Sequence, residues 1–311
     1  MDITLTPSIT GKFIAENSAM VKIDQTRIPE VAKMILADLK NGDIVDIDFN
    51  SNPLHPPSTV LDEKRRLNWV LLLDTLNFSF WADPGCEYYV EYEGTRYNGY
   101  MAFCAAIKKA FDNGVDVTSC EWMATVSEKE LGNLLRSDSG YDIPMLRERV
   151  EVLHETAEEL QAHYDGQFEN VVRLGENSVQ TLLRFIIKAF PSFNDQARFN
   201  RQKVSFFKRA QILISDAAGA LKGTPLGTFN DLGTLTMFAD YRVPQSLAHL
   251  GVFVYDEQLN VLLRNHTVLP PKDQTEMELR GCSIYACDEI VRSMNELRES
   301  GYDGVDWSKY E

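Results

Sequence analysis

Apolar residues recur at helical spacing along most of the chain. A helix is predicted after Pro29, because the first turn of a helix tolerates proline and apolar residues then recur at helical spacing, at Val31, Ile35 and Leu39. The segment Leu67–Trp81 is apolar on nearly every side, which predicts a buried helix. Similar patterns predict helices over 100–113, 144–163, 176–189 and 207–221, and after Ser127, Pro244, Asp256 and Gly281.

One short stretch alternates instead of following the helical period. Residues Glu87–Tyr92 and Thr95–Tyr97 flank the turn pair Glu93-Gly94 and predict a small β-hairpin. No internal repeat, low-complexity stretch or Pro/Gly/Ser linker divides the sequence. We therefore predict a mainly α fold, in which residues 1–311 form a single helical domain with a small β-hairpin element.

Charge and cysteine content narrow the possible environments and partners. The chain carries 31 Lys and Arg against 46 Asp and Glu, a formal net charge of −15, which argues against general binding to nucleic acids or anionic membranes. Its five cysteines are too scattered for a disulfide framework, and no Cys or His pair has zinc spacing. The first thirty residues show no signal-peptide pattern. We expect a cytoplasmic protein without metal or cofactor.

A local run of basic residues stands out against this acidic background. Between Gln196 and Ser215 the chain carries five cations and no acid, with three phenylalanines interleaved: Arg198, Arg201, Lys203, Lys208 and Arg209, with Phe199, Phe206 and Phe207. Such a cluster can hold a phosphate through charge-assisted hydrogen bonds. Such runs are more commonly a solvated helix face, here one that covers an aromatic core.

Several carboxylates lie in apolar surroundings. Asp240 stands between Leu235–Ala239 and a helix that Pro244 is expected to start, so its carboxylate should lie just before a helix N-terminus. Asp231 lies nine residues earlier, and Asp74 lies inside the predicted buried helix. Embedded acids are either paired structural groups or functional ones, and both interpretations stay open here.

Two further segments have a chemical interpretation beside a structural one. The final residues, 306–311, read DWSKYE, and such acids and aromatic rings suit a site that stacks a flat ring and binds its edge. A frayed acidic terminus is the alternative. His55 lies in the proline-rich loop 52–57, where a histidine is commonly structural or exposed.

Ordered sequence strings identify a resemblance to a known family. The chain resembles the queuosine salvage family, the queuosine 5′-phosphate N-glycosylase/hydrolase group, from about His55 to the end, whereas residues 1–50 carry little of the likeness. The strings that carry it are TLNFSFW (75–81), YNGY (97–100), LRSD (135–138), VSFFKRAQIL (204–213), LTMFADYRVPQ (235–245), LAHLG (247–251) and ELRGCS (278–283).

The resemblance implies a fold similar to helical DNA glycosylases and an enzyme that releases queuine from queuosine 5′-phosphate for salvage into tRNA. It implies that Asp240 is the catalytic carboxylate, that Phe238 lines the pocket and that His55 contacts the ligand. It also implies that three terminal residues contact the base: Asp306, Trp307 and Glu311. Asp231 and Lys208 are added from the residues themselves, Lys208 as the leading phosphate-binding candidate.

The residue types suit the chemistry of such a substrate. Queuine is a 7-deazaguanine and lacks the N7 atom whose protonation helps a purine leave, so a fixed carboxylate is needed to stabilise positive charge on the ribose. Asp240 can do so electrostatically or by forming a covalent ribosyl intermediate. We expect a monomer with a small-molecule substrate. The alternatives are a nucleic-acid base glycosylase, which the charge opposes, and a non-enzymatic helical binding module.

Overall fold

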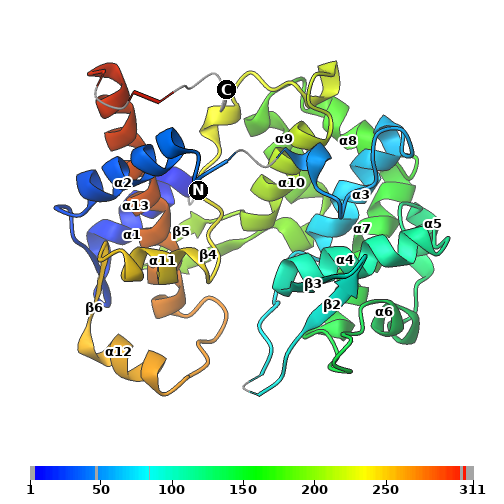
Figure 1. Cartoon of the computed structure of the whole chain (residues 1–311), viewed down its shortest axis with the longest axis horizontal. Coiled ribbons are helices and arrows are strands. Elements are labelled where there is room, and N and C mark those ends of the chain that lie inside the picture. Colours follow the sequence, from blue (N-terminus) through cyan, green and yellow to red (C-terminus); the bar gives the residue numbers. More distant parts are fainter. Residues whose placement is uncertain (1–3, 46–47, 84, 302–303, 306–311) are drawn as a thin grey trace. The chain divides into compact units, whose positions relative to one another are not determined.

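The computed structural model describes residues 4–45, 48–83, 85–301 and 304–305, and its secondary structure is mainly helical (Figure 1). The predicted mainly α class is confirmed. Contacts divide the chain into two compact units. The first comprises Met1–Asp46, Asp195–Lys208 and Leu235–Glu311, and the second comprises Ile47–Asn194 and Arg209–Thr234. The assignment of 1–311 to one domain and the likeness to DNA glycosylases stay predictions.

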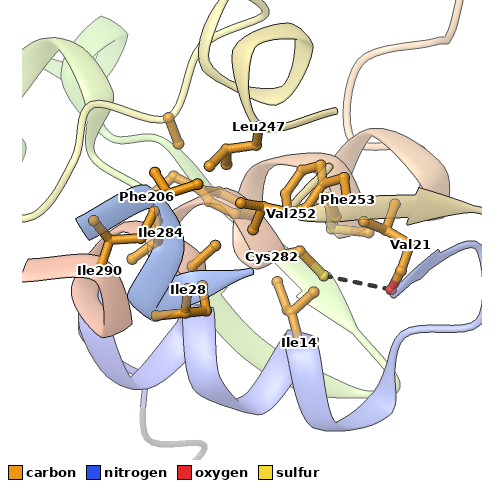
Figure 2. Packing of buried hydrophobic residues seen from close by; sticks show 14 of the residues in the cluster. Ile14, Val21, Ile28, Phe206, Leu247, Val252, Phe253, Cys282, Ile284 and Ile290 are labelled. Carbon is orange, nitrogen blue, oxygen red and sulfur yellow. Dashed lines mark hydrogen bonds between the residues drawn. The ribbon is translucent and has the colours of Figure 1, made fainter. Parts of the chain in front are cut away.

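The first unit is built around the long helix α13. Its elements are α1 (Pro7–Asn17), β1 (Val21–Ile23), α2 (Ile28–Asn41), β4 (Gln196–Phe199), β5 (Gln202–Ser205), α11 (Val243–His249), β6 (Phe253–Tyr255), α12 (Glu257–Arg264) and α13 (Gln274–Glu299). Figure 2 shows its core, where Ile14 of α1, Ile284 of α13 and Phe253 of β6 belong to one apolar cluster. The Cys282 thiol in this core donates to the Val21 carbonyl at 3.9 Å.

The start of α13 differs from the prediction, which placed a helix after Gly281. The helix begins at Gln274, where the Asp273 carboxylate caps it by accepting from the Thr275 amide at 2.8 Å. Gly281 lies inside α13 because α1 crosses there: a β-carbon on Gly281 would stand 2.6 Å from the Ile14 β-carbon. The absence of a side chain at Gly281 therefore permits close packing of α1 on α13, and this glycine does not mark the start of a helix.

The second unit surrounds a helix that is buried along most of its length. This helix is α3 (Glu63–Thr75), and every residue from Leu67 to Thr75 is buried. The other elements are β2 (Tyr89–Tyr92), β3 (Thr95–Asn98), α4 (Gly99–Asp112), α5 (Cys120–Thr125), α6 (Glu128–Leu134), α7 (Leu146–His163), α8 (Phe168–Leu174), α9 (Val179–Ala189) and α10 (Lys208–Ala220), whose first residue belongs to the first unit. The capping box of Ser127 and Glu130 opens α6.

The predicted buried helix over 67–81 is too long at its C-terminal end. The observed helix, α3, ends at Thr75 because the carbonyls of the following residues turn toward a buried arginine of α7. Arg149, fully buried, donates to the carbonyls of Leu76 and Phe78 at 2.6 Å and of Ser79 at 2.8 Å. Ser79 adopts a left-handed backbone conformation, with φ of 51°.

Within the described residues, the strands form three two-stranded antiparallel sheets, β1–β6, β2–β3 and β4–β5. The predicted hairpin is β2–β3, with Tyr92 paired to Thr95 around the Glu93-Gly94 turn. The β4–β5 hairpin was not predicted, and it occupies the first part of the basic run, for which a solvated helix face was the structural interpretation. Asn200 and Arg201, both with positive φ, form its turn.

In the part of the chain that the structure describes, no helix is long and apolar enough to span a bilayer. The five cysteines are free thiols.

Candidate active site

Asp240 ends a segment of the first unit without regular secondary structure, residues 235–240, and lies three residues before the start of α11. Ala239 is buried in the apolar core and the half-buried Met237 packs against this core. Phe238 and Asp240 are half-buried as well. The Asp240 Oδ1 atom accepts from the backbone amides of Arg242 at 2.7 Å and Val243 at 3.2 Å. Because Val243 is the first residue of α11, the predicted position before a helix N-terminus is confirmed.

The contacts of Asp240 leave one carboxylate oxygen available. Two amides fix Oδ1, and among the described residues Oδ2 has no hydrogen bond. A carboxylate held in this way has a defined orientation before any ligand arrives, as electrostatic stabilisation of a developing charge requires. The arrangement suits an acid that presents one oxygen to a cationic centre.

Lys208 lies in the same unit, at the first residue of α10. Its backbone amide donates to the Asp195 carboxylate at 3.4 Å, and the Phe206 amide donates to the Asp195 carbonyl at 3.0 Å. Between them Phe207 has φ of 49°, a conformation that a bulky side chain rarely adopts. The Lys208 backbone is therefore held at a strained turn by Asp195.

Three other cations of the basic run have contacts of their own. Arg198 and Arg201 are exposed on the β4–β5 hairpin, where the Arg198 guanidinium donates to the Arg201 carbonyl. Arg209 belongs to the second unit, where it donates to the Thr75 and Ser192 carbonyls and stacks on aromatic rings. The interleaved phenylalanines are buried, as an aromatic core requires.

His55 is buried in the second unit, with 8% of its surface exposed. Its ring stacks on Phe49, with centroids 4.0 Å apart, and its Nδ1 accepts from the Trp69 indole N–H at 3.1 Å. Because indole is only a donor, the neutral ring carries its proton on Nε2. Burial lowers the pKa of His55 to about 4, so the ring is neutral near pH 7. His55 thus offers an N–H donor.

The side-chain amide of the nearby Asn52 does not accept a hydrogen bond from the His55 Nε2–H. The Asn52 Oδ1 atom is occupied by the Leu54 backbone amide at 3.0 Å, which turns the Asn52 Nδ2 donor toward His55 Nε2 at 3.4 Å. Two donors that face each other do not hydrogen-bond. The His55 proton is therefore placed for an acceptor outside this loop.

Asp231, also in the second unit, caps α9. Its carboxylate accepts from the Ser178 hydroxyl at 2.9 Å and from the amides of Val179 at 2.6 Å and Gln180 at 3.2 Å. Burial raises its pKa, but these hydrogen bonds outweigh that effect and lower the pKa below the ordinary value. The contacts give Asp231 a structural role, and its contact with a substrate stays a prediction.

Asp74, the third embedded acid, is fully buried in α3, where its carboxylate accepts from the Asn77 amide at 3.2 Å. The three terminal candidates, Asp306, Trp307 and Glu311, lie outside the described residues.

Comparison with known proteins assigns the family. The model of a family described as queuosine salvage protein matches residues 54–305. The chain belongs to the queuosine salvage protein family. The match begins next to His55 and confirms the resemblance drawn from the ordered strings. It includes four of the other candidates, Lys208, Asp231, Phe238 and Asp240.

Relatives in this family match along most of their length. A protein of Bos taurus is 39% identical over 296 residues, which cover 94% of this chain and 85% of the relative. A protein of Nematostella vectensis is 37% identical over 310 residues, 98% and 88% of the two chains. One of Sphaerobacter thermophilus is 37% identical over 295 residues, 92% and 84%. Each is named queuosine 5′-phosphate N-glycosylase/hydrolase.

Two residues that link Lys208 to the segment of Asp240 were not predicted from the sequence. They are Asp195, which binds the Lys208 amide, and Arg280, which binds Asp195 and the Ala239 carbonyl. Arg280 lies in the ELRGCS string, and its i,i+4 spacing to Glu276 becomes meaningful only once α13 is known to begin at Gln274. The sequence carried no comparable signal for Asp195.

Proposed function

We propose that this chain is an N-glycosidase that hydrolyses queuosine 5′-phosphate and releases queuine for salvage into tRNA. The observation that carries the proposal is the Asp240 carboxylate, fixed by two backbone amides with one oxygen available. The likeness to relatives named for this activity, over 84–88% of their length, supports the same substrate.

The proposed mechanism rests on charge at the ribose. The bond between the anomeric carbon and the base breaks, and the base takes up a proton in place of the sugar. Water supplies the hydroxyl group of the ribose product, either directly or by hydrolysing an ester formed between the ribose and Asp240. The Asp240 carboxylate stabilises the cationic ribose in the transition state, either across space or by a transient covalent bond. Such an acid is needed because a 7-deazaguanine base has no N7 atom to protonate.

The remaining candidates are proposed to bind the substrate. Lys208 pairs with the 5′-phosphate, because an ammonium group binds phosphate oxygens through charge-assisted hydrogen bonds. His55 donates its Nε2–H to an acceptor on the ligand. The other proposed contacts, from the resemblance or the residue types, are Phe238 and Trp307 on the base ring, Asp306 and Glu311 on its edge, and Asp231.

We also propose that residues 1–311 act as one glycosidase domain, monomeric and cytoplasmic, without direct contact with nucleic acid or membrane. The net charge of −15 supports the last point, because it repels polyanions. Size-exclusion chromatography with light scattering tests the monomer.

The direct test is incubation with queuosine 5′-phosphate and chromatography for free queuine. Asp240→Asn should lower turnover by about 10²-fold or more, the typical loss when an electrostatic stabiliser is removed. Its amide oxygen can still accept from Arg242 and Val243, so the melting temperature should stay near that of wild type.

Asp256→Asn is the matched control, because Asp256 caps the neighbouring helix α12 in a similar way. This variant should keep full activity. Near-normal queuine release by Asp240→Asn would exclude Asp240 as the catalytic acid, and no release by wild type would exclude the activity.

A further inference from the structure

Arg280 of α13 lies in a charged cluster inside the first unit, with 15% of its side chain exposed. Its guanidinium binds the Asp195 carboxylate through both terminal nitrogens, with Nη1 to Oδ1 at 3.1 Å, and contacts Glu276 Oε1 at 3.3 Å. The remaining nitrogen, Nε, donates to the Ala239 carbonyl at 3.0 Å. The plane packs on the Phe206 ring, 4.1 Å from its centroid.

This environment does not suit Arg280 as a phosphate-binding cation. Two carboxylates already share the guanidinium, and together they outweigh its charge. Burial would lower the pKa of Arg280, but Asp195 and Glu276 more than compensate and raise it. All three of its nitrogens are engaged within the protein, so its role must be exerted through the groups that it holds.

The groups that Arg280 holds belong to the two segments that carry the candidate chemistry. The Ala239 carbonyl directly precedes Asp240. Asp195 binds the Lys208 amide through its carboxylate and the Phe206 amide through its carbonyl, and it thereby holds the strained Phe207 between them. A continuous chain of bonds thus runs from the Lys208 backbone through Asp195 and Arg280 to the residue before Asp240.

We propose that Arg280 is a positioning residue that fixes Lys208 and Asp240 relative to each other, so that binding of the phosphate aligns the ribose with the carboxylate. This inference rests on the proposed function. We call the hydrogen bonds of Arg280 to Asp195 and to the Ala239 carbonyl a brace. Small displacements of reacting groups lower a reaction rate by large factors, so the brace affects catalysis without contacting the substrate.

Arginine is the residue type that this brace requires. Its planar fork directs two N–H groups at one carboxylate while Nε–H points elsewhere in the same plane. Lysine retains the positive charge that Asp195 and Glu276 need, but it cannot reproduce this fork and also reach the Ala239 carbonyl. Arg280→Lys therefore removes the geometry and keeps the charge.

The test compares Arg280→Lys with Arg292→Lys. Arg292 lies on the same helix, is exposed, and pairs with Glu289 and Glu296, so its replacement controls for the chemical change. For Arg280→Lys we expect kcat/KM to fall by about 10²-fold with queuosine 5′-phosphate but by about tenfold or less with the nucleoside, which has no phosphate to align. Arg292→Lys should match wild type with both.

Amide hydrogen exchange gives a readout that does not depend on activity. In the ligand-free Arg280→Lys variant, peptides covering 206–210 and 239–244 should exchange faster than in wild type, whereas peptides of α1 should not change. Equal losses with both substrates, unchanged exchange in the two segments, or faster exchange throughout the first unit would overturn the proposal.

A second variant keeps the proposal testable if Arg280→Lys does not fold. Asp195→Asn preserves size and weakens the same link, so it should change substrate preference in the same direction by a smaller factor. Unchanged preference in a folded Asp195→Asn would count against the brace. If wild type releases no queuine, the proposed function fails, while the exchange experiment still decides whether Arg280 braces the two segments.

Discussion

At the scale of single residues, Lys208 makes the proposed phosphate contact directly testable. Lys208→Ala removes the ammonium group but keeps the backbone amide that binds Asp195, so the fold should be retained. Without this charge, KM for queuosine 5′-phosphate should rise at least about tenfold, the loss expected for a charge-assisted contact of about 1.5–3 kcal/mol, and KM for the nucleoside should change little. Steady-state kinetics with both substrates measures the difference.

Lys203→Ala is the comparison for this prediction, since Lys203 lies on β5 of the same basic run. It should leave both KM values close to wild type. If Lys203→Ala, and not Lys208→Ala, impaired the phosphorylated substrate alone, the phosphate contact would belong to the hairpin.

Because His55 is buried, we expect the free energy of unfolding to depend on pH in a specific way. Burial lowers its pKa to about 4 in the folded chain, against about 6.5 in an unfolded one. Below pH 6.5 the unfolded chain therefore binds a proton that the folded chain does not, and the free energy of unfolding falls as the pH decreases toward 4. The loss between about pH 7.5 and about pH 5 should be about 2 kcal/mol.

Urea unfolding of wild type and His55→Gln at both pH values measures this contribution. The variant has no imidazole to titrate, so its loss of stability over the interval should be about 2 kcal/mol smaller. The same loss in both proteins would show that His55 does not titrate in this way.

Candidate residues could be predicted from the sequence where the signal is local. Asp240 was placed before a helix because Pro244 and the apolar Leu235–Ala239 segment are its neighbours in the chain. The connection of Lys208 to Asp240 could not be predicted, because it runs through Asp195 and Arg280, which are 85 residues apart. No periodicity or spacing encodes such a contact.

At the scale of elements, the crossing of α1 and α13 depends on small residues. A methyl group at Gly281 would stand 2.6 Å from the β-carbon of Ile14, which is attached to the backbone and cannot rotate away. The better helix propensity of alanine contributes about 1 kcal/mol, whereas overpacking typically costs about 1–3 kcal/mol. Gly281→Ala should therefore lower the free energy of unfolding, as measured by urea denaturation.

Gly233→Ala is the control for this substitution, because nothing lies within 4 Å of the added β-carbon. It should leave stability nearly unchanged. A Gly281→Ala protein as stable as wild type would mean that the two helices separate without cost.

Element boundaries were predicted well only where a local signal sets them. The capping box at Ser127 and the Glu93-Gly94 turn are short patterns, and both elements were confirmed. The predicted end of α3 was wrong because Arg149, which is distant in the sequence, binds the carbonyls that follow the helix. The β4–β5 hairpin was missed because its two four-residue strands do not alternate buried and exposed positions, so the sequence showed no period-two pattern there.

At the scale of the whole molecule, the division into units has no local sequence signal. The first unit is assembled from three separate chain segments, and no linker composition marks the places where the chain passes between units. Membership of a unit follows from long-range packing, such as that of α1 near one end of the sequence against α13 near the other. The mainly α class, by contrast, follows from helical spacing repeated along the entire chain.

At the chain end, the resemblance assigns Asp306, Trp307 and Glu311 to the base. Deletion of residues 306–311 removes one ring and two acceptors together, and each lost partner should cost about 1–3 kcal/mol of binding free energy. Queuine affinity should therefore collapse in calorimetric titration, while the helical circular-dichroism signal persists, because α13 ends at Glu299. The double variant Lys309→Ala/Ser308→Ala, which keeps these three residues, should bind as wild type does. Unchanged affinity after the deletion would favour the alternative interpretation of an acidic terminus without a role in binding, and base recognition would then have to come from residues such as His55 and Phe238.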